Sequence, residues 1–115
     1  MQNLNWTSEF DAAITVCDEK AIIISMNDKA CKTFEKYGGK NLIGKSLYDC
    51  HNEKSQQAIN ELLSSGKKNI YSIEKNGIKK LIHQSPWYKE GKIAGLVELS
   101  IEIPFEMEHF VRKID

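Results

Sequence analysis

The stretch "GKIAGLVELSIEIP", Gly91 to Pro104, alternates apolar and polar residues along most of its length. The apolar residues that recur at every second position are Val97, Leu99, Ile101 and Ile103. A period of two predicts a β-strand with one buried face, because successive side chains of a strand point to opposite sides of the sheet. We therefore expect Leu99 and Ile101 to lie in the core, between this strand and the helices that cover the sheet.

Two more strands are expected just before this one. Residues Ile70 to Lys75 and Ile78 to Trp87 again follow a period of two. The pair Asn76-Gly77 between them is the strongest short-range indication of a β-hairpin. Nearer the N-terminus, Ala12 to Cys17 and Ala21 to Met26 are short segments that predict the two strands of another hairpin.

Helical spacing occupies the middle of the chain. One predicted helix is capped by Asn27 or Asp28, includes Phe34 and ends at Gly38-Gly39. A second follows Asn52, with Ile59 and Leu62 on one side and Gly66 as its end. Strands that flank a helical block, without regular βαβ alternation, predict an α+β fold with an antiparallel sheet covered by helices on one face.

Composition excludes several classes of function. The 115 residues carry 16 Lys+Arg and 16 Asp+Glu, so no strong positive field favours nucleic-acid or anionic-membrane binding. The longest strongly apolar run, Ala21 to Ile24, is far shorter than the roughly 20 residues of a membrane span. Three widely spaced cysteines without a C-x-x-C pair indicate reduced thiols, and we expect a cytoplasmic protein.

Several short motifs, in order, resemble those of the PAS domain family. Asp18, Ala21, Ile23 and Asn27 match the entry to the fold, with alanine where glycine is usual, and "NLIGKSLYD", Asn41 to Asp49, matches its central loop segment. "SSGKK", "KNG" and "GKIAGLVELSIEIP" match later segments, and "YDCHNEKSQQAINELL" resembles a bacterial subgroup with a histidine before the long helix. The resemblance covers roughly Ala12 to Pro104.

The resemblance implies a five-stranded antiparallel sheet with the strand order 2-1-5-4-3 and a small cavity under the helices. It also implies a sensory domain that dimerises through its N-terminal segment and the outer face of the sheet. The resemblance places the PAS domain at residues 12–104. The apolar residues Leu4, Trp6 and Phe10 predict a short helical cap over 1–11, and residues 105–115, after Pro104, are expected to form a tail or short helix.

The adjacent residues Cys50 and His51 are weak candidates for catalysis. Neighbouring side chains point in different directions, and no orienting acid or oxyanion turn is recognisable, so we expect no enzymatic activity. If the helix began near Asp49, His51 and Ser55 would share a face with Ile59 and Leu62. If Asn52 is the cap instead, that alignment is lost.

The candidate cavity wall combines that helix with the last strands. His83 shares a face with Leu81 and Ser85 and is equally consistent with a structural or a ligand-binding histidine. The proposed wall comprises His51, Ser55, Ile59, Leu62, His83, Ser85, Leu99 and Ile101.

Three hypotheses for the function remain open. The first is a small-molecule sensor, and the second is a dimerisation module without a ligand. The third is a haem sensor with His51 or His83 as the axial ligand, since neutral imidazole binds iron. A flavin photosensor is not expected, because Asp49, His51 and Asn52 around Cys50 do not match the reactive-cysteine motif of that class.

Overall fold

The computed structural model describes residues 4–50 and 52–114. The strands are β1 (Ala13–Asp18), β2 (Ile23–Met26), β3 (Asn69–Lys75), β4 (Ile78–Lys89) and β5 (Lys92–Ile103). The α-helices are α1 (Asp28–Thr33) and α2 (Glu53–Ser65), and the 3₁₀ helices are η1 (Glu35–Tyr37), η2 (Gly39–Leu42) and η3 (Leu47–Cys50).

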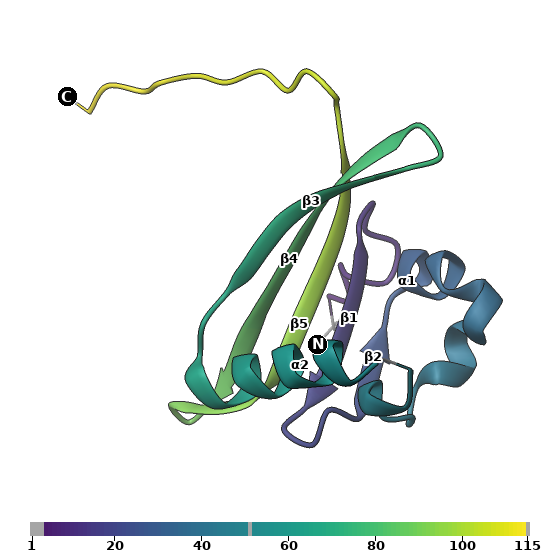
Figure 1. Ribbon diagram of the computed structural model, residues 1–115. Coiled ribbons are helices and arrows are strands. Elements are labelled where there is room, and N and C mark those ends of the chain that lie inside the picture. Colours follow the sequence, from purple (N-terminus) through teal and green to yellow (C-terminus); the bar gives the residue numbers. More distant parts are fainter. Residues whose placement is uncertain (1–3, 51, 115) are drawn as a thin grey trace.

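The five strands form one antiparallel sheet in the order β2-β1-β5-β4-β3 (Figure 1). The first hairpin lies beside the last strand, so β1 and β5 are neighbours at the centre although they are far apart in the chain. The predicted α+β fold and strand order are confirmed.

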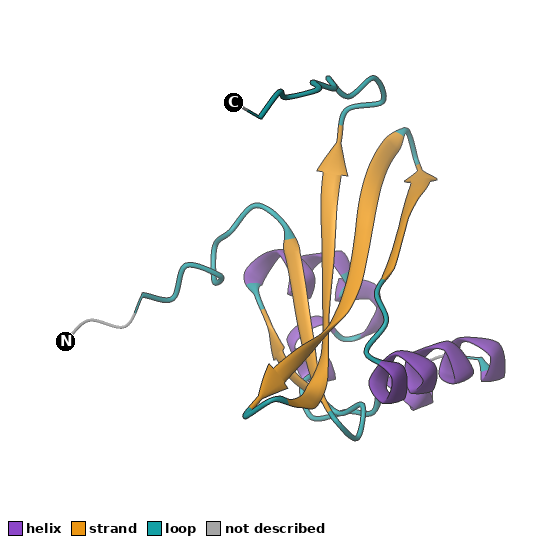
Figure 2. Ribbon diagram, turned by 90° about the vertical axis from the view of Figure 1, so that its left-hand side faces the viewer, coloured by secondary structure: helices purple, strands orange, loops and turns teal. Residues whose placement is uncertain are grey.

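The two α-helices cover different parts of the inner face of the sheet. Helix α1 contacts β1 and β2, whereas α2 contacts β4 and β5. Figure 2 shows α2 on one side of the sheet and the N-terminal segment, from residue 4, leaving on the other side. The space between the α1 region and α2 therefore lies over the central strands.

The β3–β4 hairpin turns at the predicted place. Asn76 has φ 53° and Gly77 has φ 77°. Two consecutive positive φ angles are typical of the type I′ turn, whose twist matches that of the flanking strands. The Asn-Gly pair adopts these angles at little cost, which explains why it predicts the hairpin so well.

Asn27 anchors the first helix and the N-terminal segment at once. Its side-chain oxygen accepts hydrogen bonds from the backbone N–H groups of Ile14 and Ala30, at 2.9 and 3.0 Å. Its amide nitrogen donates to the carbonyl oxygens of Thr7 and Ala12, both at 2.8 Å. The buried Asn27 is therefore the predicted N-cap and also a junction of three chain segments.

The first helix is shorter than its apolar spacing predicts. It ends at Thr33 instead of continuing to Gly38, and η1 follows after Phe34, whose ψ of 22° departs from helical geometry. The Thr33 hydroxyl donates to the Lys29 carbonyl, a bond that competes with regular helical geometry. The turn after Phe34 then brings Gly39 against α1, where an added Cβ would lie 3.0 Å from the Cys31 carbonyl oxygen.

The expected N-terminal helical cap is not present in residues 4–11, which form a turn over residues 6–9. Leu4, Trp6 and Phe10 lack a regular helical period, and Trp6 instead packs edge-to-face on Phe10 at 5.4 Å between ring centroids. At the other end, residues 104–114 form an irregular tail without a helix (Figure 1).

The expected facing of β5 is wrong. Leu96 lies beside Cys17 of β1, and Glu98 lies beside Thr15, and all four residues line the cavity under the helices. Because side chains alternate along a strand, Leu99 and Ile101 lie on the opposite, outer face. A period of two identifies two faces, but it does not say which one the helices cover, and here the more polar face of β5 points inward.

Candidate functional site

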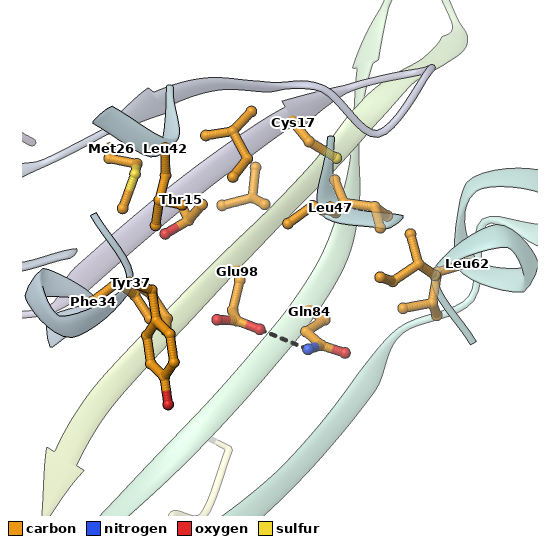
Figure 3. A pocket seen from close by; sticks show the side chains of 14 residues that line it. Thr15, Cys17, Met26, Phe34, Tyr37, Leu42, Leu47, Leu62, Gln84 and Glu98 are labelled. Atoms are coloured by element: carbon orange, nitrogen blue, oxygen red, sulfur yellow. Dashed lines mark hydrogen bonds between the residues drawn. The ribbon is translucent and has the colours of Figure 1, made fainter. Parts of the chain in front are cut away.

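A cavity of about 400 Å³ lies between the helices and the inner face of the sheet (Figure 3). This volume is within the range of small-molecule sites, near its lower end. Its apolar lining comprises Cys17, Ile23, Met26, Phe34, Tyr37, Leu42, Leu47, Ile59, Leu62, Leu96 and Val97. Its polar lining comprises Thr15, Gln84 and Glu98.

Helix α2 supplies one wall of this cavity. Leu62 is buried against Cys17 and Leu96, and Ile59 packs beside them. The helix begins after Asn52, whose side-chain oxygen accepts from the Ser55 N–H at 2.9 Å, and ends at Gly66 in the left-handed conformation. Caps at both ends thus fix the position of the turn that carries the two apolar side chains.

A row of four polar residues crosses the inner face of the sheet, and three of them, Thr15, Gln84 and Glu98, line the cavity. Asn69, Gln84, Glu98 and Thr15 lie opposite one another on β3, β4, β5 and β1. The Gln84 amide nitrogen donates to the Glu98 carboxylate at 2.7 Å, and the Gln84 oxygen accepts from the Asn69 amide at 3.1 Å. Figure 3 shows Gln84 and Glu98 among the apolar lining residues, joined by their hydrogen bond.

Cys17 contributes an unreactive thiol to the cavity wall. The residue is 2% exposed, and burial is the main cause that raises the pKa of its thiol above the usual value. Only the thiolate is strongly nucleophilic, so this environment disfavours nucleophilic chemistry. Cys17 acts in the cavity as a small apolar side chain.

The structure brings only part of the predicted cavity wall together. Ile59 and Leu62 line the cavity as expected. Ser55 is partly buried on α2 but does not line it. Since Asn52 caps the helix, the alternative with a start near Asp49 is wrong, and His51 itself lies outside the described residues.

The other four predicted wall residues lie on the outer face of the sheet. His83 is paired with Leu99, and Ile101 with Leu81. Gln84, between His83 and Ser85, points into the cavity, so its two neighbours point away from it. The expected burial of Leu99 and Ile101 between helices and sheet was therefore wrong, and both residues are partly exposed.

The sequence did not predict the polar row, because polar residues that alternate with apolar ones usually lie on the solvent-facing side of a strand. Glu98 alternates with Val97 and Leu99, and such an acidic residue usually faces water. One signal was available in β4. Gln84 lies on the same face as the apolar residue Ile82, so this face of β4 is not entirely polar. The face of each β5 residue is assigned by its partner on β1: Glu98 is paired with Thr15 and Leu96 with the buried Cys17. This assignment requires the register of β1 against β5, which the sequence does not give.

No metal centre is evident among the described residues, which contain no group of three or more His, Cys, Asp and Glu side chains suited to hold an ion. None of the described cavity residues is a histidine. In residues 4–50 and 52–114, no helix has the length and apolar character needed to cross a bilayer.

Comparison with solved structures finds the same fold. The PAS domain of histidine kinase ThkA has 17% identity and a TM-score of 0.65, with 80% of this chain and 99% of that chain covered. The Aer2 receptor from Vibrio cholerae, described as a dual PAS-heme oxygen sensor, has 13% identity and a TM-score of 0.60, with 81% and 95% covered. VqmA bound to DPO has 11% identity and a TM-score of 0.68, with 89% of this chain and 56% of that chain covered.

Comparison at the level of sequence identifies the family. No curated protein sequence matches the chain significantly. The family model described as PAS domain matches residues 11–95, which is most of the chain and includes the first hairpin, the helical block and the β3–β4 hairpin. PAS domains are generally sensory modules of signal transduction and not enzymes. From its sequence match, its strand order and its helix-covered cavity, this chain belongs to the PAS domain family.

Proposed function

We propose that this PAS domain is a cytoplasmic sensor that binds a small molecule in the cavity between α2 and the central strands. It has no catalytic activity of its own and passes the signal on through contacts between two copies. The cytoplasmic location is supported by the three cysteines without a pairing motif, of which Cys17 and Cys31 are free thiols in the described structure.

The observation that carries the proposal is the composition of the cavity. A volume of about 400 Å³ combines mostly apolar side chains with one fixed polar pair, Gln84 and Glu98. Small-molecule sites have this make-up, because apolar contact provides affinity and a few placed polar groups provide orientation. A core evolved only for stability gains little from a partly buried carboxylate among apolar side chains.

Two structural neighbours with this fold are described with bound ligands, which supports the proposal. VqmA has been solved with DPO bound, and the Aer2 receptor is described as a haem-binding oxygen sensor. Identities of 11% and 13% do not transfer either ligand to this chain. An organic molecule is favoured over haem because His83 faces away from the cavity, which leaves His51 as the remaining candidate for an axial ligand.

A role in dimerisation is supported by a second observation. The outer face of the sheet presents Ile70, Leu81, Leu99 and Ile101, which we call the outer apolar face. Ile70 is 53% exposed, and Trp6 and Phe10 of the N-terminal segment are 65% and 48% exposed. Leu81, Leu99 and Ile101 are partly exposed, and neighbouring apolar side chains left accessible on one face are typical of a protein interface.

Native mass spectrometry of the purified chain tests both roles together. We expect a dimer whose mass exceeds that of two polypeptides by the mass of the bound molecule. An Ile59→Trp variant, which fills the cavity, should lose that extra mass. The control Ile73→Trp, at an exposed position outside both the cavity and the outer apolar face, should retain it. A wild-type spectrum that shows only the bare polypeptide mass, together with no binding of added small molecules, would reject the sensor role.

A further inference from the structure

The carboxylate of Glu98 is the end point of an oriented chain of hydrogen bonds. The Asn69 amide donates to the Gln84 oxygen at 3.1 Å, and the Gln84 amide donates to Glu98 at 2.7 Å. Each bond fixes the orientation of the next group, so the Gln84 side chain presents its nitrogen, and not its oxygen, to Glu98. Gln84 and Glu98 both line the cavity, and Glu98, at the end of the chain, is an acceptor-only group.

The negative charge of Glu98 has no cationic partner in the described structure. The ion pairs found within residues 4–50 and 52–114 join Lys29 to Asp11 and Lys67 to Glu61. A carboxylate has two oxygens and about four acceptor positions, of which Gln84 occupies one. Glu98 thus keeps acceptor capacity toward the cavity, in surroundings that are otherwise mainly apolar.

The charge of Glu98 also acts on a neighbouring side chain. Burial is the larger cause that raises the pKa of Tyr71, and the negative charge of Glu98 raises this pKa further. Tyr71 is paired with Ile82 on β4 and shares the inner face with Gln84. Glu98 therefore contributes a negative charge to the inner face of the sheet beside Tyr71.

Two aromatic side chains line the same cavity as Glu98. Phe34 and Tyr37 come from the segment after α1, and Figure 3 shows them on the side of Glu98 away from Leu62. Aromatic faces attract cations through their quadrupoles. Tyr37 is 69% exposed, so Phe34 contributes the more enclosed of the two rings. A carboxylate and an aromatic ring in one mainly apolar cavity favour a positively charged group and disfavour an anion.

We infer that the ligand class of this cavity is a small amphipathic amine, with a protonated nitrogen at Glu98 and an apolar body against Leu62 and Leu96. The inference rests on the proposed small-molecule function and specifies its chemistry. A charge-assisted hydrogen bond is roughly twice as strong as a neutral one. Because Glu98 is partly exposed, the ammonium group keeps part of its hydration, which limits the cost of removing it from water.

Isothermal titration calorimetry with four probes that share a 2-phenylethyl group tests the inference. The probes are 2-phenylethylamine, 2-phenylethanol, 3-phenylpropanoate and ethylbenzene, which differ in the charge and polarity of the end group. We expect the amine to bind about tenfold more tightly than the alcohol, equivalent to about 1.4 kcal/mol, and the anion to bind most weakly. The variant Glu98→Gln should bring the amine down to the affinity of the alcohol.

The variants keep the fold and isolate the charge. In Glu98→Gln the new amide oxygen can still accept the hydrogen bond from Gln84, so only the charge is lost. Glu102→Gln, at an exposed position on the same face of β5, removes an equal charge outside the cavity and should leave all four affinities unchanged.

Each outcome is decisive. Unchanged amine affinity in Glu98→Gln, or equal binding of alcohol and amine to the wild type, would overturn the amine inference and leave the small-molecule function standing. Binding of none of the four probes would overturn the inference and count against the sensor role as well.

Discussion

The indole nitrogen of Trp87 donates a hydrogen bond of 2.9 Å to the carbonyl oxygen of Cys17, and Gly95 lies directly against both groups. A Cβ at Gly95 would be 1.8 Å from the Cys17 oxygen and 2.7 Å from the indole nitrogen. This three-residue contact joins β1, β4 and β5 at the edge of the cavity, close to Leu96. It also explains why a glycine stands within the long strand β5.

The first prediction concerns this contact. Gly95→Ala cannot be accommodated without separating β1 from β5, so it should lower the free energy of unfolding by about 3 kcal/mol or more, at the upper end of overpacking effects. Urea denaturation measures the change. Gly91→Ala is the control, because open space surrounds that glycine and only its φ of 78° is strained, at a cost of about 1–2 kcal/mol. A smaller loss for Gly95→Ala than for Gly91→Ala would contradict the packing described here.

A second prediction follows from the four hydrogen bonds of Asn27. Asn27→Ala removes the partners of buried backbone groups at Ile14 and Ala12 as well as the cap of α1. We expect a loss of about 2–4 kcal/mol in the free energy of unfolding, since each unsatisfied buried group costs about 1–3 kcal/mol. Asn52→Ala removes an exposed N-cap only and should cost about 1 kcal/mol. Equal effects of the two substitutions in urea denaturation would show that the Asn27 junction is not stabilising.

The third prediction distinguishes the two faces of the sheet. Leu62, 8% exposed, packs with Cys17 and Leu96, so Leu62→Ala should cost about 2–5 kcal/mol of unfolding free energy, the usual range for buried aliphatic residues. Ile101 lies on the outer apolar face and is partly exposed, so Ile101→Ala in the monomeric protein should cost less, about 1 kcal/mol. Comparable losses, measured by denaturation at low protein concentration, would mean that Ile101 belongs to the main core.

The strands and turns could be predicted from the sequence because their determinants are local. Asn76-Gly77 has the φ angles of its turn built into its residue types, and Asn27, Asn52 and Gly66 mark helix ends through their own hydrogen bonds and φ angles. The strand order came from the resemblance to the family and not from periodicity.

The facing of the central strands could not be obtained in the same way. Leu99 and Ile101 are more apolar than Glu98 and Ser100, so hydrophobicity alone favours the wrong face. The inner face is assigned by the pairing of Glu98 with Thr15 across β1 and β5, which are distant in sequence. In β5 the face toward the helices carries Glu98 and Ser100 and the outer face carries Leu99 and Ile101, so the usual rule that the more apolar face is the covered one fails here.

The fourth prediction tests the outer apolar face as a dimer interface. The double variant Leu99→Glu/Ile101→Glu places two like charges at the centre of the proposed interface and should convert the dimer to a monomer. Size-exclusion chromatography with multi-angle light scattering measures the mass. Ile73→Glu, a charge placed on an exposed residue of the opposite face of the sheet, should leave the dimer intact. A double variant that remains dimeric would exclude this face as the contact.

The fifth prediction addresses the central claim, that a small molecule binds between α2 and the inner face of the sheet. The measurement is a methyl NMR titration of protein labelled at Ile, Leu and Val with neutral 2-phenylethanol. The methyl signals of Ile59, Leu62 and Leu96 should shift in a saturable manner, because these side chains line the cavity, while those of Leu99 and Ile101 remain in place. Saturable shifts confined to Leu99 and Ile101, or the absence of any saturable shift, would contradict the claim.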